Sequence, residues 1–221
     1  MSDRVCILNF HGIGQPTRDF WSGEERVWVG KEFFEAVLDE VKERPDVLVT
    51  FDDGNVSDIE IALPALLARG LKARFFVVSE FVDKKGFLSV DNIKTLQAAG
   101  MVIGNHGKFH HPRRDMTHGE LHAELIEAKD RIEQIIANRI DCAACPYGDY
   151  DRMALKYLRE YGYKQVYTSD GGWTGKNHWL QPRNSLRSHS SIEEVRQLFR
   201  EPKFSIKGLV RMCKINIKRW R

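Results

Sequence analysis

The sequence predicts an α/β protein whose parallel strands form a single barrel. Short apolar runs rich in Val, Ile and Phe alternate along the chain with longer segments of helical period, which is the pattern of repeated β-α units. About seven such units follow one another without a compositional break or an internal repeat, and this favours one barrel over two domains. The 221 residues, of which 42% are hydrophobic, can bury a full core. An open doubly wound sheet is the alternative architecture.

The predicted strands are the short runs of β-branched and aromatic residues. The first lies near the N-terminus, and the last has a less regular pattern than the others. In chain order they are Val5–Phe10, Val47–Phe51, Ala73–Val78, Met101–Gly104, Ile140–Ala144, Gln165–Thr168 and Leu180–Leu186.

The predicted helices lie between these strands and have recognisable ends. From Lys31 to Val41 the apolar residues fall on one stripe, and Ser89 caps a helix that Gly100 ends. Two further helices open with a capping box, in which a hydroxyl residue and a glutamate three positions later satisfy each other's backbone N–H groups. These boxes are Thr117-x-x-Glu120, before a long helix to about Ala137, and Ser190-x-x-Glu193, before the last helix; Asp151 to Gly162 supplies another helix between them.

Charge and cysteine content exclude several classes of protein. Lys and Arg number 34 against 31 Asp and Glu, a net charge of +3, so we expect no nucleic-acid partner. Four scattered cysteines do not make a disulfide scaffold, and a reducing compartment is the default. Cys142 and Cys145 have C-x-x-C spacing, but no second pair completes a zinc site, and we interpret them as ordinary thiols. The run Val5–Phe10 is too short for an export signal, which predicts a cytoplasmic protein.

Polar residues gather where the predicted strands end. In barrels and in doubly wound sheets alike, functional groups collect at the carboxyl ends of the parallel strands. The candidates at these ends are His11, Asp52 and Asp53, His106 and His110, Pro146-Tyr147-Gly148, and Asp170. Ligand-type side chains at several independent strand ends indicate one shared site.

Asp52 and Asp53 are adjacent carboxylates, followed by Gly54. In extended backbone their side chains point in roughly opposite directions, so each can address a different partner. One can bind a metal while the other accepts a proton from a water whose pKa the metal lowers. Taken alone, Asp-Asp-Gly is also a common turn with solvated carboxylates.

His106 and His110 supply the nitrogen ligands that would complete such a site. The flanking Gly104, Gly107 and Pro112 predict a shaped loop rather than a helix. Two imidazoles and one carboxylate leave an open coordination position for water, as a catalytic zinc site requires. The other histidines nearby are interpreted as exposed residues of a basic loop: His111, His118 and His122.

Three motifs in this order resemble those of the polysaccharide deacetylase family, which includes the NodB-like enzymes of carbohydrate esterase family 4. They are Thr50-Phe51-Asp52-Asp53-Gly54, His106-Gly107-Lys108-Phe109-His110 and Ala144-Cys145-Pro146-Tyr147-Gly148. The resemblance implies a deformed (β/α)7 barrel that hydrolyses the N-acetyl groups of amino sugars. It implies Asp53, His106 and His110 as ligands of a divalent metal, usually zinc, with Asp52 as the general base and the backbone N–H of Tyr147 as an oxyanion donor.

The chain departs from the family pattern at two catalytic positions. Ala144 stands where many members carry an arginine that orients the base, and Leu186-Arg187-Ser188-His189 has one residue more than the usual Leu-x-His motif. We take His189 as the candidate general acid. The form Ala-x-Pro-Tyr-Gly and the pair Pro182-Arg183 resemble another branch of the family. The expected substrate contacts are Pro146, Asp170 and Trp173.

Two other functions fit parts of the pattern. A carbohydrate-binding pseudoenzyme would keep the barrel and lose turnover, but it would not need Asp52 as a base. A magnesium-dependent phosphoryl-transfer site would use Asp52-Asp53-Gly54, but the histidine pair disfavours it because magnesium prefers oxygen ligands. The expected substrate is therefore an N-acetylated polymeric, oligomeric or lipid-linked glycan.

We expect the barrel to occupy residues 1–202 and a basic tail to occupy residues 203–221. Read as a helix, the tail has Lys207, Arg211, Lys214, Lys218 and Arg221 on one face and Leu209, Cys213, Ile217 and Trp220 on the other. Such a helix could lie on an anionic membrane at its cytoplasmic side. A terminal helix packed on the barrel, with a solvated basic face, explains the pattern equally well.

Overall fold

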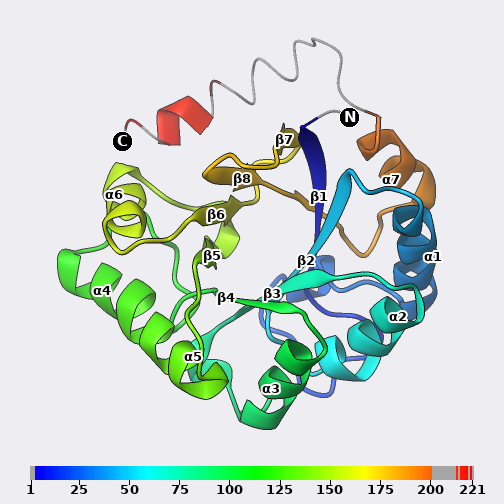
Figure 1. Ribbon diagram of the computed structural model, residues 1–221, viewed down its shortest axis with the longest axis horizontal. Helices are drawn as coiled ribbons and strands as arrows, with labels where there is room; N and C mark the ends of the chain where they lie inside the picture. Colours follow the sequence, from blue (N-terminus) through cyan, green and yellow to red (C-terminus); the bar gives the residue numbers. More distant parts are fainter. Residues whose placement is uncertain (1–2, 201–212, 214, 219, 221) are drawn as a thin grey trace.

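Parallel strands make up the centre of the molecule, and helices surround them. The computed structural model describes residues 3–200, 213, 215–218 and 220. In this part of the chain one sheet, mostly parallel, is nearly closed into a barrel, with the helices packed around its outside (Figure 1). The predicted (β/α)7-type barrel is confirmed, and an open doubly wound sheet is not what the chain forms.

Six strands pair in chain order to make the body of the barrel. They are β1 (Arg4–Phe10), β2 (Val47–Asp53), β3 (Ala73–Val77), β4 (Val102–Asn105), β5 (Cys142–Ala144) and β6 (Gln165–Thr168). Each is parallel to the next. A further strand, β7 (Trp173–Gly175), runs antiparallel to β1 and was not predicted, since three residues with one glycine give no strand pattern.

A short segment between the two ends of the sheet closes the barrel. β8 (Leu180–Pro182) pairs with β6, whereas β9 (Asn184–Ser185) pairs with β1, both in parallel. The single strand predicted over Leu180–Leu186 is therefore wrong in detail. It is divided at Arg183, after a proline that lacks the N–H needed to continue a ladder.

The outer layer contains seven α-helices between residues 31 and 198, with two turns of π-helix among them. The α-helices are α1 (Lys31–Lys42), α2 (Leu63–Ala68), α3 (Val90–Ala98), α4 (His118–His122), α5 (Ala128–Ile136), α6 (Arg152–Glu160) and α7 (Ile192–Leu198). The π-helical turns are η2 (Asp58–Ala62) and η4 (Ala123–Glu127), and short 3-10 turns are η1 (Glu24–Arg26), η3 (Ser79–Phe81) and η5 (Pro146–Gly148).

Most predicted helix ends are confirmed. Ser89 and Thr117 each form a complete capping box. The last helix starts one residue later than predicted, because Ser191 accepts the hydrogen bond from the backbone N–H of Glu194. The sequence Ser-Ser-Ile-Glu-Glu contains two overlapping boxes, and the hydroxyl of Ser190 instead accepts from the N–H of Arg187.

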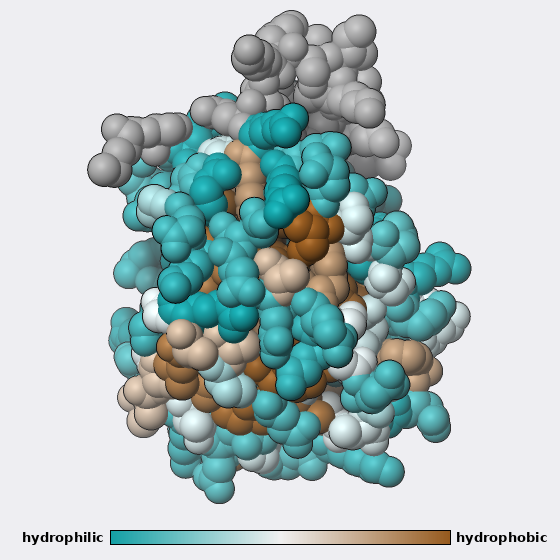
Figure 2. Space-filling model, turned by 90° about the vertical axis from the view of Figure 1, so that its right-hand side faces the viewer, coloured by the Kyte–Doolittle hydropathy of each residue, from teal (hydrophilic) through white to brown (hydrophobic). Residues whose placement is uncertain are grey.

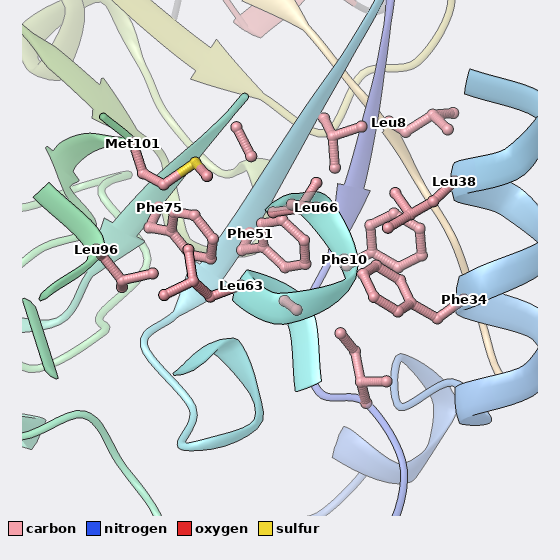
Figure 3. Close-up of a cluster of buried hydrophobic side chains, with 14 of the residues drawn as sticks. Leu8, Phe10, Phe34, Leu38, Phe51, Leu63, Leu66, Phe75, Leu96 and Met101 are labelled. Carbon is pink, nitrogen blue, oxygen red and sulfur yellow. The ribbon is translucent and has the colours of Figure 1, made fainter. Parts of the chain in front are cut away.

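Apolar side chains fill both sides of the strands. Outside the barrel, an aromatic row runs from β3 across β2 and β1 to α1 (Figure 3). Phe75 stacks on Phe51 at 4.6 Å, Phe51 on Phe10 at 5.6 Å, and Phe10 meets Phe34 edge-on at 5.0 Å. The other face of the strands forms a smaller cluster of Val5, Ile7, Phe76, Cys142, Ala144 and Tyr167. Because side chains alternate along a strand, Asn9 and Asp52 continue this second face toward the strand ends.

The outer surface over α1 and α7 is mainly hydrophilic, with smaller hydrophobic areas (Figure 2). None of the helices in the described ranges is long and apolar enough to cross a bilayer. The four cysteines are free thiols, and three of them are buried.

Only part of the predicted tail can be compared with the structure. The boundary at residue 202 and residues Lys207, Leu209, Arg211, Lys214 and Arg221 lie outside the described residues. Positions 213, 215–218 and 220 are helical, and this helix lies near α6 in Figure 1. Ile217 and Trp220 are exposed, whereas Lys218 binds the barrel.

Candidate active site

A cavity of about 390 Å³ opens at the carboxyl ends of the strands. One wall comes from the segment between β1 and α1, which contributes Trp21 and Glu24. The other wall comes from the ends of the barrel strands and the loops after them, through Asp52, Asp53 and Tyr147. The cavity therefore lies where polar residues were predicted to gather.

Three of the predicted ligands meet beside this cavity. The ligand atoms of Asp53, His106 and His110 all lie within 4.8 Å of one another. Oδ1 of Asp53 is 3.4 Å from Nε2 of His106 and 3.2 Å from Nε2 of His110. The end of β2 supplies the carboxylate, and the loop after β4 supplies both imidazoles. The structure thus brings together side chains from the ends of β2 and β4, which β3 separates in the sheet.

The donor atoms of this group fit a divalent metal. Oδ1 of Asp53 is buried and has no hydrogen-bond partner in the part of the chain that the structure describes, although two ring nitrogens approach it. Nδ1 of His106 lies 3.1 Å from the carbonyl oxygen of Ala144. Since a carbonyl only accepts, Nδ1 carries the proton, and Nε2 presents its lone pair to the site. The arrangement is one carboxylate oxygen and two imidazole nitrogens, the donor set of many catalytic zinc sites.

Protonation of the ligands supports the same interpretation. Burial lowers the pKa of His110 to about 4, so its imidazole is neutral at physiological pH. Burial opposes ionisation of Asp53, but the neighbouring His110 and His106 outweigh it and lower the pKa of the carboxyl. A neutral imidazole and an ionised carboxylate are the forms that bind a cation.

The backbone of the site is held in an unusual conformation at three non-glycine residues. Asp53, His110 and Tyr147 have φ angles of 76°, 63° and 57°. Such left-handed residues are uncommon outside glycine and concentrate at functional sites. The expectation that extended backbone separates the two carboxylates is therefore wrong. Asp53 turns back, and His106 Nε2 lies 3.7 Å from Asp52 Oδ2 as well as 3.4 Å from Asp53 Oδ1.

Asp52 is held by a cation that the sequence did not identify as part of the site. Arg183 donates from Nη1 to Oδ1 and from Nη2 to Oδ2 of Asp52, both at 2.7 Å. Asn9 donates a further hydrogen bond to Oδ2 at 2.9 Å. Burial would raise the pKa of Asp52, but Arg183 and His106 lower it to about 2. Two features of the sequence could have indicated these partners. Asn9 is a polar residue in the apolar strand Val5–Phe10, and Arg183 is a charged residue inside the predicted strand Leu180–Leu186.

Two histidines outside the metal group differ in their relation to the cavity. His11, at the end of β1, lines the cavity, and its Nε2 lies 3.9 Å from Oδ2 of Asp52. Its Nδ1 is buried without a hydrogen-bond partner. His189 is exposed and does not line this cavity. The structure therefore places His11, and not the predicted His189, beside Asp52, the predicted general base.

Of the residues predicted to contact substrate or oxyanion, Tyr147 lies at the cavity. Its ring is 4.6 Å from that of His110, and its side chain is 69% exposed. Asp170 accepts hydrogen bonds from Tyr150, Thr168 and Lys218 and does not line the cavity. The other two, Pro146 and Trp173, are buried, and the indole of Trp173 donates to the carbonyl of Leu198.

Comparison with known proteins agrees with this geometry. A family model described as polysaccharide deacetylase matches residues 39–166, more than half of the chain. Over 141 residues the chain is 24% identical to YxkH of Bacillus subtilis (strain 168), which is named as a polysaccharide deacetylase. That alignment covers 64% of this chain and 50% of YxkH, so the chain spans about half the length of this curated relative.

Solved structures share the fold at low sequence identity. A polysaccharide deacetylase from Bacillus cereus superposes with a TM-score of 0.77 at 20% identity, covering 88% of this chain and 68% of the other. The Streptococcus pyogenes deacetylase PplD, solved in complex with acetate, gives a TM-score of 0.75 at 21% identity, covering 90% and 99%. IcaB from Ammonifex degensii gives 0.70 at 19% identity, covering 89% and 96%.

Proposed function

The chain belongs to the polysaccharide deacetylase family, and from this premise we propose that it is a metal-dependent hydrolase that removes N-acetyl groups from amino sugars of a saccharide. The observation that carries the proposal is the position of an ionised, doubly held carboxylate, Asp52, next to the group of Asp53, His106 and His110. A carboxylate able to accept a proton beside a metal-binding group is what amide hydrolysis by water requires.

Asp53, His106 and His110 would hold the metal, most simply zinc. When bound, such a cation polarises the acetamide carbonyl and lowers the pKa of water. Asp52 accepts the proton of the attacking water, because its low pKa keeps it ionised and Oδ1 accepts a hydrogen bond only from Arg183 among the described residues. The backbone N–H of Tyr147 is the proposed donor to the oxyanion of the tetrahedral intermediate.

Collapse of this intermediate breaks the C–N bond and releases acetate and a free amine, which must gain a proton. We assign this proton transfer to His11, because it lines the cavity and its Nε2 lies 3.9 Å from Asp52 Oδ2. A histidine is suited to the task, since its ordinary pKa lies near neutrality. His189 does not line the cavity.

A catalytically impaired protein of the same fold is the alternative that the missing arginine at position 144 suggested. Arg183 supports activity instead, because from its position between β8 and β9 it holds Asp52 with two hydrogen bonds of 2.7 Å. The substrate is proposed to be an N-acetylated glycan. For the tail, the hydrogen bonds of Lys218 to the carbonyl of Gly148 and to Asp170 favour docking on the barrel over membrane contact.

The proposal is tested by metal analysis and by acetate release from a panel of N-acetylated glycans. The natural chain is compared with Asp52→Asn, which keeps the shape of the side chain but cannot accept the proton. We expect about one equivalent of divalent metal in both proteins and a loss of at least about 100-fold in turnover for the variant. Metal binding without acetate release from any glycan would favour the pseudoenzyme, and equal rates would exclude Asp52 as the base.

A further inference from the structure

In the loop that carries both proposed histidine ligands, each backbone N–H group from position 106 to position 109 donates a hydrogen bond. The N–H of His106 donates to the carbonyl of Val77 at 2.9 Å, and that of Gly107 donates to the side chain of Asn105 at 2.6 Å. The next two N–H groups, at positions 108 and 109, donate to a single side chain, that of Glu124. The turn that returns the chain to His110 is therefore defined by polar contacts from outside the loop.

Glu124 reaches this loop from the surrounding helix layer. Its Oε2 accepts from the N–H of Lys108 and its Oε1 from the N–H of Phe109, each at 2.9 Å. The residue is only 2% exposed. Among the described residues its single ion-pair contact is His111, whose Nδ1 lies 3.6 Å from Oε1. The carboxylate thus serves the loop backbone rather than a lysine or arginine.

The helix is locally altered at the position of this contact. Glu124 lies in the π-helical turn η4, between α4 and α5. Such turns interrupt the regular helical period and are frequent at functional sites. The carboxylate also packs directly on Gly107, where an added Cβ would stand 2.3 Å from Oε2. Gly107 has φ of 97°, so both the glycine and the glutamate are needed for this close approach.

We infer that Glu124 is a positioning residue for the metal site. By accepting two consecutive N–H groups it fixes the turn before His110, whose φ of 63° directs Nε2 to 3.2 Å from Asp53 Oδ1. Glu124 acts through the backbone of the loop and not through a ligand side chain. The inference rests on the proposed metal-dependent function, and it adds a residue to which no motif drew attention.

The substitution Glu124→Gln tests the inference, with Glu127→Gln as the matched control. Glu127 lies in the same π-helical turn, but its carboxylate binds the side chain of Lys108. Gln at position 124 keeps the size of the side chain and replaces one acceptor by an N–H₂ group that opposes a backbone N–H. Zinc affinity is measured on metal-free protein by competition with a chromophoric chelator, and thermal unfolding of the metal-free proteins is recorded in parallel.

We expect zinc to bind Glu124→Gln about 10- to 100-fold more weakly than the natural chain, the range typical of groups that orient metal ligands. Glu127→Gln should bind within about twofold of the natural chain, as expected for an exposed ion pair. Glu124→Asp, which keeps the charge but shortens the reach, should fall between them, and it decides the question if the glutamine variant does not fold.

Equal zinc affinity of the natural chain, Glu124→Gln and Glu127→Gln would overturn the inference and leave the proposed function standing. A lower melting temperature of Glu124→Gln with unchanged zinc affinity would also overturn it, because the contact would then serve stability alone. Absence of zinc binding in the natural chain would instead overturn the proposed metal-dependent function together with the inference.

Discussion

At the scale of single residues, the site depends on a buried charge pair. Arg183 is fully buried and Asp52 is 2% exposed, and two hydrogen bonds join them. Buried pairs of this kind add little net stability, but loss of one partner leaves an uncompensated charge. The pair therefore fixes the direction of Asp52, the proposed base, and stands in for the arginine expected from the family resemblance where this chain has Ala144.

Arg183→Lys should separate the role of geometry from that of charge. A lysine keeps the positive charge but cannot donate in parallel to both carboxylate oxygens. We expect turnover to fall about 10- to 100-fold, with zinc affinity nearly unchanged, because Asp53, His106 and His110 do not contact this guanidinium in the described structure. Steady-state acetate release and metal titration measure the two effects. Turnover equal to that of the natural chain would show that the fork geometry is dispensable.

His11→Gln and His189→Gln form a matched pair of substitutions for the proton donor. We expect His11→Gln to lower kcat about 100-fold or more, because glutamine cannot transfer a proton to the leaving amine. His189→Gln should leave kcat within about twofold, because an exposed side chain outside the cavity contributes little. The opposite ranking of the two variants would assign the acid to His189.

At the scale of elements, capping residues in the sequence predict where a helix starts more reliably than they predict whether its hydrogen-bonding pattern stays α-helical. Thr117 caps its helix as predicted, because a capping box is complete within four residues. The same sequence gave no sign of the π-helical turn at Ala123–Glu127, where Glu124 is bonded to the loop before His110. Metal ligands within contiguous motifs were predictable, whereas Glu124, Asn9 and Arg183 acquire their roles only through tertiary contacts.

The other π-helical turn, η2, opens with a buried acid that has no hydrogen-bond partner, Asp58. Burial, and then the charges of Asp53 and Asp52, raise the pKa of Asp58 well above 3.8. The folded protein therefore retains a proton that the unfolded chain loses above about pH 4. The contribution of Asp58 to stability is consequently largest below the unfolded pKa of this group and declines as the pH rises toward its folded pKa.

Asp58→Asn should remove this dependence, since the amide resembles the protonated acid. In metal-free protein we expect the variant to melt at a higher temperature than the natural chain at pH 8, by roughly 2–4 °C for each kcal/mol gained, and at nearly the same temperature at pH 4. Thermal unfolding followed by circular dichroism at both pH values measures this. If the melting temperatures of the variant and the natural chain differed by the same amount at pH 4 and at pH 8, Asp58 would not hold an extra proton in the folded protein.

At the scale of the whole molecule, the barrel was predictable because its body is built from consecutive β-α units, each recognisable by its own period. Its closure was not, because β8 and β9 pair with strands at opposite ends of the sheet. No local pattern states which strand a three-residue segment will join. The closing segment is also the one that carries Arg183.

The proposed metal ligands and the arginine that holds Asp52 lie far apart along the chain, because Arg183 belongs to the closing segment. The proposed metal ligands lie between residues 53 and 110, at the ends of β2 and β4, which both pair with β3. Arg183 is separated from Asp52 by 131 positions. Contacts between distant positions form late, because they require closure of a long loop. During refolding in the presence of zinc we therefore expect metal binding to return before hydrolytic activity, as stopped-flow assays of each can measure; simultaneous recovery would contradict this order.

During synthesis on the ribosome, the same arrangement sets the order in which the parts of the site are made. Synthesis passes residues 53–110 long before residue 183 is made, so a nascent chain carries the proposed metal ligands while Asp52, the proposed base, still lacks the hydrogen bonds of Arg183. The proposed activity then requires the segment that carries Arg183 to be made and to pair with β6 and β1.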